Sequence, residues 1–314
     1  MTGVQTCALP ISDSKVLEIM IPVLYSVTMF VALTGNLLLI FIVRRRPETR
    51  TITSFVFVNM AAADLLVAVT VMPITMAMPY TDMRWLTGII GHITCKAVYF
   101  GFHVSIGASI LSLTLMAMDR YLAVCFPLRG FTTFRRAKVL SVVIWLTSMI
   151  VMIPAAVLWK IEKPLSAPGV YCQPAFQDVF GDFKNGMTGY YSYLFLLTYL
   201  IPLLMISVLY GMVIRELWRR KKPGVILSRT EGHQEAMKRK VVRTLVIVTA
   251  AFACCWLPTQ TYHLIFAFNS NLHMPLPRYV FFVCMWCGHA NSAFNPWLYM
   301  LLTDKFRKIG RAHV

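Results

Sequence analysis

The chain alternates between long apolar stretches and short polar segments. A helix that crosses a lipid bilayer needs about 20 consecutive, mostly apolar residues. Seven stretches meet this requirement, at approximately residues 17–43, 53–79, 91–124, 137–159, 188–217, 239–267 and 277–302. Because no water is present inside lipid, a spanning segment must satisfy its own backbone amides, and a helix does so. The pattern therefore predicts an all-α fold, a bundle of seven transmembrane helices in one domain.

The two ends of the chain do not follow this pattern. Residues 1–12 and 309–314 resemble translated sequencing adapter rather than protein sequence. Ile309–Val314 can be encoded by ATCGGAAGAGCACACGTC, and the reverse complement of that sequence, in a shifted frame, encodes Thr6–Pro10. One adapter joined to both ends of a cDNA fragment gives this result. We therefore expect residues 13–308 to represent the natural protein, as one seven-transmembrane domain without its native tails.

The net charge of +17 would by itself be compatible with nucleic-acid binding. The positions of the charges argue against that class. If the first helix runs inward, 23 of the 30 Lys and Arg residues lie on the cytoplasmic side, as the positive-inside rule requires of a membrane protein. We therefore expect an extracellular N-terminus, no nucleic-acid partner, and contacts between the basic loops and anionic membrane lipids of the inner leaflet.

Polar side chains occur at membrane depth, where they are costly and are candidates for function. Asp64 lies in the second apolar stretch with no basic residue near it in the sequence, and Asn291, Ser292 and Asn295 lie in the seventh. A buried carboxylate beside hydroxyl and amide groups suits a hard cation such as sodium. The same groups could instead form a purely structural polar network, and residue chemistry alone leaves both interpretations open.

Pro154, Pro202, Pro258 and Pro296 are among the prolines that lie within the predicted helices. Proline removes one helix hydrogen bond and kinks the helix. Kinks beside Trp256 and Asn295 would create weak points at which two conformations interconvert. A static kink that only shapes the bundle is the alternative.

Taken in order, these positions resemble the rhodopsin-like (class A) G-protein-coupled receptors over essentially all of residues 17–308. The matching motifs are Gly35-Asn36, Asn59 to Asp64, Cys95 followed by Asp119-Arg120-Tyr121, Trp145, Pro202 with Tyr210, Phe252 with Cys255-Trp256-Leu257-Pro258, Asn295-Pro296-Trp297-Leu298-Tyr299, and Asp304-Lys305-Phe306-Arg307. The last motif begins a short amphipathic eighth helix in this family. The resemblance implies a plasma-membrane receptor that binds an extracellular ligand, activates heterotrimeric G proteins and binds arrestin.

The resemblance also implies roles for individual residues. A switch for the G protein would consist of Asp119, Arg120, Tyr121, Tyr210, Asn295, Pro296 and Tyr299. A repacking triad with its toggle would consist of Ile110, Pro202, Phe252 and Trp256. An allosteric sodium ion, with no other cofactor expected, would bind Asp64, Ser109, Asn291 and Asn295. A disulfide would join Cys95 to Cys172 in the longest outer loop, where both cysteines meet an oxidising compartment.

One position departs from the family pattern. Many members carry an acidic residue twenty positions before the proline of the sixth helix, and it pairs with the switch arginine. This chain has Lys238 there. We therefore expect Arg120 to depend on Asp119 as its ionic partner, and the resting state to be less favoured than in those members.

Single residues argue against two ligand classes. Phe102 stands seven residues after Cys95, where amine receptors carry an aspartate, and His289 stands in the place of the retinal-binding lysine. The pocket is instead expected to offer aromatic and neutral hydrogen-bonding groups, from Phe102, His103, Gln260, His263, Phe266, Met285 and His289. Such groups suit one end of a peptide, including a C-terminal amide. The outer loop at 160–187 is long enough to form a hairpin that leaves this pocket open.

Within the family, the chain is similar to neuropeptide receptors near the orexin, allatotropin and RFamide groups. The similarity lies in Glu216-Leu217-Trp218 followed by Lys222-Pro223-Gly224, in Val143–Ala155, and in Ala290-Asn291-Ser292-Ala293. Many of these receptors have glutamine where this chain has Phe102. A receptor for a non-peptide ligand, a constitutively active receptor and a transporter are the alternatives. An enzyme is not expected, because the sequence offers no nucleophile–base pair or metal-ligand set.

Overall fold

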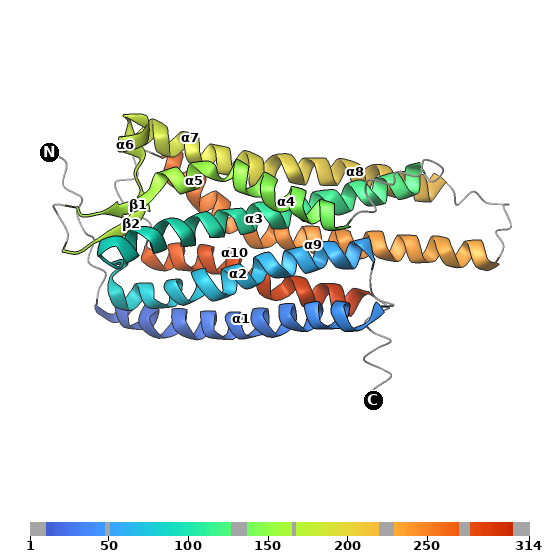
Figure 1. Cartoon of the computed structure of the whole chain (residues 1–314), viewed down its shortest axis with the longest axis horizontal. Helices are drawn as coiled ribbons and strands as arrows, with labels where there is room; N and C mark the ends of the chain where they lie inside the picture. The colour runs from blue at the N-terminus through green and yellow to red at the C-terminus, as the bar shows by residue number, and fades with distance from the viewer. Residues whose placement is uncertain are drawn as a thin grey trace.

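A computed structural model describes residues 11–47, 51–126, 137–164, 168–219, 229–269 and 277–303. Within these ranges, seven helical rods lie side by side along the long axis of the molecule (Figure 1). The rods are α1 (Ile11–Arg45), α2 (Ile52–Thr81), α3 (Gly88–Cys125), α4 (Ala137–Val151) with α5 (Ile153–Leu158), α7 (Phe183–Phe195) with the π-helix η3 (Leu196–Leu200) and α8 (Ile201–Arg219), α9 (Arg229–Phe268), and α10 (Arg278–Leu302). The predicted seven-helix bundle is confirmed.

The rods pack around α3. Contacts run from α1 to α2, α2 to α3, α7 to α9 and α9 to α10, and α10 returns to α1. The central helix α3 also packs against α4 and α8. Side chains that point inward from α3 therefore meet groups from most of the other rods, which positions the polar and aromatic residues considered below.

In the described part of the chain, five helices are long and apolar enough to cross a membrane by length and composition, at Leu17–Arg45, Ile52–Thr81, Gly88–Cys125, Phe183–Arg219 and Ala236–Phe268. The fourth rod contributes a shorter apolar helix, Lys138–Val151, which α5 continues. The seventh rod, α10, carries buried polar groups, among them His289, Asn291 and Asn295. Phe30 and Val208 remain 67% and 57% exposed on the outside of the bundle, as expected of side chains that face lipid.

Two of the four prolines interrupt their helices. The fourth rod breaks at Met152, and α5 begins with Pro154 in its first turn. The π-helix η3 ends immediately before Ile201 and Pro202, which is consistent with the missing amide hydrogen of proline. Pro258 and Pro296 lie within α9 and α10, which both continue through them.

A small antiparallel hairpin covers one end of the bundle. It consists of β1 (Trp159–Glu162) and β2 (Tyr171–Pro174), with Ile161 opposite Cys172. A disulfide joins Cys95 in α3 to Cys172 in β2, so both the predicted hairpin and the predicted disulfide are confirmed. The short helix α6 (Phe176–Phe180) follows at the same end, which we call the hairpin end, and the other we call the Arg120 end (Figure 1).

Several predictions lie outside the described residues. These are the adapter-like segments at 1–10 and 309–314, the start of the eighth helix at Asp304–Arg307, and the Lys222-Pro223-Gly224 motif. The division of the chain into adapter and natural protein, and the eighth helix, therefore stay predictions.

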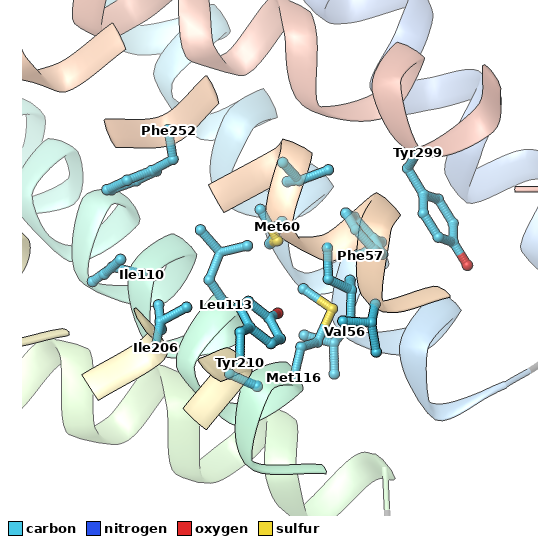
Figure 2. Close-up of a cluster of buried hydrophobic side chains, with 14 of the residues drawn as sticks. Val56, Phe57, Met60, Ile110, Leu113, Met116, Ile206, Tyr210, Phe252 and Tyr299 are labelled. Atoms are coloured by element: carbon cyan, nitrogen blue, oxygen red, sulfur yellow. The ribbon is translucent and has the colours of Figure 1, made fainter. Parts of the chain in front are cut away.

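The largest hydrophobic core cluster in the described residues includes α3 side chains from Ile106 to Val124, and Figure 2 shows part of it. It brings together side chains from α1, α2, α3, α8, α9 and α10. Phe57, Ile110, Leu113, Ile206 and Phe252 are each no more than 1% exposed. Between helices in lipid, such close packing stabilises the bundle through van der Waals contacts rather than by removing apolar surface from water, and the packed cluster lies between the cavities at the two ends.

Candidate functional site

The Arg120 side chain lies near the end of α3 and is paired with its neighbour. Asp119 Oδ2 accepts hydrogen bonds from Arg120 Nη2 and, at 3.0 Å, from Arg120 Nε. The two side chains are 25% and 18% exposed, so the ion pair is partly shielded from water. Tyr121 points elsewhere, and its ring meets the edge of Phe126 at a centroid distance of 5.7 Å.

A cavity of about 290 Å3 opens beside Arg120. Its lining combines apolar groups with hydroxyls and two cations, and comes from Thr51, Ile52, Thr53, Arg120, Met237, Lys240, Val241, Thr244, Leu245, Tyr299, Leu302 and Thr303. Lys240 shares this cavity with Arg120, whereas Lys238 is not among the described lining residues. A positive cavity at this end suits a partner that carries negative charge.

Two tyrosines of the predicted switch, Tyr210 and Tyr299, pack against different neighbours. The Tyr299 ring stacks on Phe57 with centroids 3.8 Å apart, and its hydroxyl is 2.9 Å from the hydroxyl of Ser54 at the start of α2. Tyr210 lies on the other side of the core cluster, among Leu113 and Met116 (Figure 2). Its buried hydroxyl has no hydrogen-bond partner in the described residues. Tyr299 is thus held against α2 and away from Tyr210.

The repacking triad and the toggle tryptophan occupy adjoining positions. Ile110 and Phe252 are both 1% exposed and belong to the same cluster, and Pro202 is buried on α8. The Phe252 and Trp256 ring centroids are 6.1 Å apart, and Phe102 lies 6.1 Å beyond Trp256. A chain of contacting rings therefore runs from the hairpin half of the bundle into the core cluster.

Asp64 is 3% exposed and is bonded to α10. Its Oδ1 accepts from Ser292 Oγ at 2.8 Å, and its Oδ2 accepts from Asn295 Nδ2 at 3.2 Å. Asn291 and Ser109 are also buried, but no hydrogen bond joins either to Asp64 in the described residues. The structure thus brings Asn295 of the predicted sodium set to the carboxylate directly, and adds Ser292, which that set did not include.

A deep cavity of about 30 Å3 lies in the hairpin half of the bundle. Its lining comes from α3, α7, η3 and α9, through Phe102, His103, Ile106, Leu194, Thr198, Trp256, Thr259, Gln260 and His263. Gln260 is 6% exposed, with its amide nitrogen 3.4 Å from the Thr198 hydroxyl. Four of the seven predicted pocket residues therefore line one cavity, and Trp256 forms its floor toward the core.

The other three predicted pocket residues lie elsewhere. His289 is 3% exposed, is 2.9 Å from the Tyr25 hydroxyl through Nδ1, and meets Phe102 edge-on. Met285 is 8% exposed on the same helix. Phe266 is 48% exposed and lines a separate outer cavity near the hairpin. Neither His289 nor Met285 is among the described residues that line the deep cavity, and His289 reaches its wall through the contact with Phe102.

The sequence reasoning missed the tyrosines that hold the pocket histidines. The Nδ1 atom of His103 is 2.6 Å from the Tyr99 carbonyl, so it must donate, and Nε2 can then accept from the Tyr190 hydroxyl at 3.2 Å. The Tyr191 ring stacks on His263 at 4.6 Å. The sequence does show two adjacent tyrosines, Tyr190 and Tyr191, at the start of the fifth apolar stretch. It does not show that they contact His103 and His263.

The structure is a seven-helix bundle with cavities at both ends and a row of contacting rings between them, an arrangement that suits a transmembrane receptor. Residues 35–299 match the model of the family "7 transmembrane receptor (rhodopsin family)", and the chain belongs to that family. Members are receptors rather than enzymes. The protein is therefore a multi-pass receptor of the plasma membrane that binds an extracellular ligand and signals through G proteins.

Proposed function

We propose that the ligand is a neuropeptide and that one end of it, such as a C-terminal amide, binds in the deep cavity. The observation that carries this proposal is the lining of that cavity. Gln260, His103 and His263 are neutral hydrogen-bonding groups, Phe102 and Trp256 are aromatic, and the described lining contains no acid. The volume of about 30 Å3 corresponds to roughly two water molecules, which is about the size of a terminal carboxamide.

The proposed orientation has the hairpin end outside the cell. The Cys95–Cys172 disulfide at that end supports it, because disulfides persist in oxidising compartments. The charges at the opposite end agree, since the positive-inside rule favours Arg44, Arg45 and Arg120 on the cytoplasmic side. The cavity beside Arg120 and Lys240 then faces the cytoplasm, where a G protein and arrestin would dock.

An allosteric sodium ion is the second part of the proposal. Hard cations prefer several oxygen ligands, and Asp64 supplies a buried carboxylate. The side-chain oxygens of Asn291 and Asn295 are buried without a hydrogen-bond partner in the described residues. These acceptor oxygens fit the ligand set of such a cation. The separation of Tyr299 from Tyr210 is, on this proposal, the resting arrangement that sodium would favour.

The experiment that tests the peptide proposal compares Gln260→Ala with the parent receptor. An amidated peptide agonist, found by a calcium-release screen, should lose about tenfold in potency, because an unpaired buried amide costs about 1–3 kcal/mol. The free-acid form of the same peptide is the matched ligand control, and its potency should change much less. A small amine as the best agonist, or equal losses for amide and free acid, would show that this cavity does not hold the peptide end.

A further inference from the structure

A second cavity, of about 250 Å3, lies at the hairpin end beside the deep cavity. We call it the outer cavity. The hairpin, α6, the start of α7 and the end of α9 enclose it, with walls that include Glu162, Gln173, Phe176, Phe183, Tyr191 and Phe266. Four of these six side chains are aromatic. Its chemistry therefore differs from that of the deep cavity, which contains histidines and no acid.

Glu162 supplies the negative charge of the outer cavity. Two other acids lie in the same outer segment at 160–187, but each has another partner. Asp178 forms an ion pair with Lys160, and Asp182 caps α7 by accepting from the backbone amide of Asn185 at 2.6 Å. Glu162 Oε2 accepts one hydrogen bond from the Gln173 side chain. No basic side chain is among the described residues that line this cavity.

The outer cavity is separated from the deep cavity by one pair of rings. Tyr191 lines the outer cavity and His263 lines the deep one. Their rings are stacked, with centroids 4.6 Å apart and planes at 22°. The two cavities are therefore distinct compartments that share an aromatic wall, and each can select its own part of a ligand.

We infer that the outer cavity is a subsite for a cationic side chain of the ligand, a guanidinium or an ammonium group, bound by the Glu162 carboxylate and the surrounding aromatic faces. Aromatic faces attract cations through the ring quadrupole. A carboxylate adds a charge-assisted hydrogen bond to an N–H donor. The inference rests on the proposed function in one respect, that the hairpin end faces the extracellular ligand.

The test uses charged thiol reagents and needs no peptide. A cysteine replaces Phe266, and intact cells are treated with a trimethylammonium methanethiosulfonate or with the anionic sulfonatoethyl reagent. The rate at the parent chain, which has free cysteines of its own, is subtracted. Cation attraction and anion repulsion both depend on the cavity charge. The rate ratio is the rate at which the introduced cysteine reacts with the cationic reagent divided by its rate with the anionic reagent. Glu162→Gln, which keeps the size of the side chain, should therefore lower this rate ratio by about tenfold.

The matched control is Asp82→Asn. It removes the same charge from the same end of the bundle, but Asp82 contacts Arg84 and Arg278 rather than the outer cavity. Its rate ratio should stay within about twofold of the parent, a shift much smaller than that of a charge inside the cavity. Gln177→Glu adds a carboxylate at a lining position that bonds to Gly181 and Phe183 rather than to Glu162, and it should raise the ratio, so a result is available even if Glu162→Gln does not reach the cell surface.

An unchanged ratio in both cavity variants would overturn the subsite, and so would an equal fall in Asp82→Asn. These outcomes are separable from a failure of the peptide proposal. A rate ratio that follows Glu162 supports the subsite even if the best agonist is not a peptide. Conversely, an amidated peptide that depends on Gln260, combined with a ratio indifferent to Glu162, would refute the subsite alone.

Discussion

The hydrogen bond between Tyr299 and Ser54 offers the sharpest test of how the resting arrangement is held. The Ser54→Ala substitution removes the hydroxyl that lies 2.9 Å from the Tyr299 hydroxyl. It leaves the start of α2 intact, because the Ser54 backbone amide still donates to Thr51 Oγ1 at 3.1 Å. Ser54 is 1% exposed, and its hydroxyl also lies 2.8 Å from Thr51 Oγ1, a contact that the substitution removes as well.

The expected size of the effect follows from this geometry. A net intramolecular hydrogen bond contributes about 1 kcal/mol, and the stacking of Tyr299 on Phe57 is retained in the variant. If the bond exists only in the resting state, its loss shifts the equilibrium toward the active state by about fivefold. Ligand-free nucleotide exchange should rise by the same factor, as long as the active state is a small fraction of the receptor.

The assay is nucleotide exchange on a panel of purified heterotrimeric G proteins, with membranes matched for receptor number. Ser207→Ala is the control, because it makes the same chemical change at an exposed position whose hydroxyl bonds only to the Leu203 carbonyl of its own helix in the described residues. Exchange should be unchanged in this control. Basal exchange that stays constant or falls in Ser54→Ala would refute the idea that this hydrogen bond restrains activation.

Three further predictions concern the switch residue Arg120, the basic residue Lys238 at the same end of the bundle, and Asp64 at the proposed cation site. Arg120→Ala should leave surface expression largely intact but abolish nucleotide exchange, and normal exchange in this variant would mean that Arg120 is not the contact for the G protein. Lys238→Glu should lower ligand-free exchange by up to a few-fold, because an exposed ion pair contributes only about 0–1 kcal/mol; a rise would exclude an interaction with Arg120. Asp64→Asn should remove any sodium dependence of agonist binding, since a cation that favours the resting state and an agonist weaken each other by the same factor; sodium dependence that survives would locate the ion elsewhere.

The helices were predictable because a helix that crosses the membrane needs a run of about 20 mostly apolar residues, which few other structures require. The ends of the helices were less predictable. The sixth apolar stretch begins near residue 239, yet α9 begins at Arg229, because a helix needs no apolar side chains once it leaves the lipid. The hairpin at Trp159–Pro174 followed from loop length, but its register did not.

The partners of the inward-facing groups were the least predictable part of the candidate site. A pattern of polar residues indicates that Asp64 and α10 face the interior, but not that Ser292 rather than Ser109 is the one bonded to the carboxylate. In the same way, His289 was placed on the correct face of its helix, although Tyr25 of α1 is its partner. Such pairings depend on side-chain rotamers and on how neighbouring rods are rotated, neither of which a single sequence encodes in a readable form.

The π-helix η3 changes the phase of the fifth rod. In an α-helix each residue turns by about 100°, so Leu194 and Ile206, twelve positions apart, would face directions that differ by about 120°. A π-turn inserts one extra residue into the helical count, which reduces that difference to about 20°. Both side chains are in fact buried. A one-residue deletion within Leu196–Leu200 would thus restore regular helix geometry and leave this difference at about 20°, so Tyr190 and Tyr191 would still face the histidines they contact. Substitutions that turned the segment into regular helix at its present length would instead rotate the two tyrosines by about 100°.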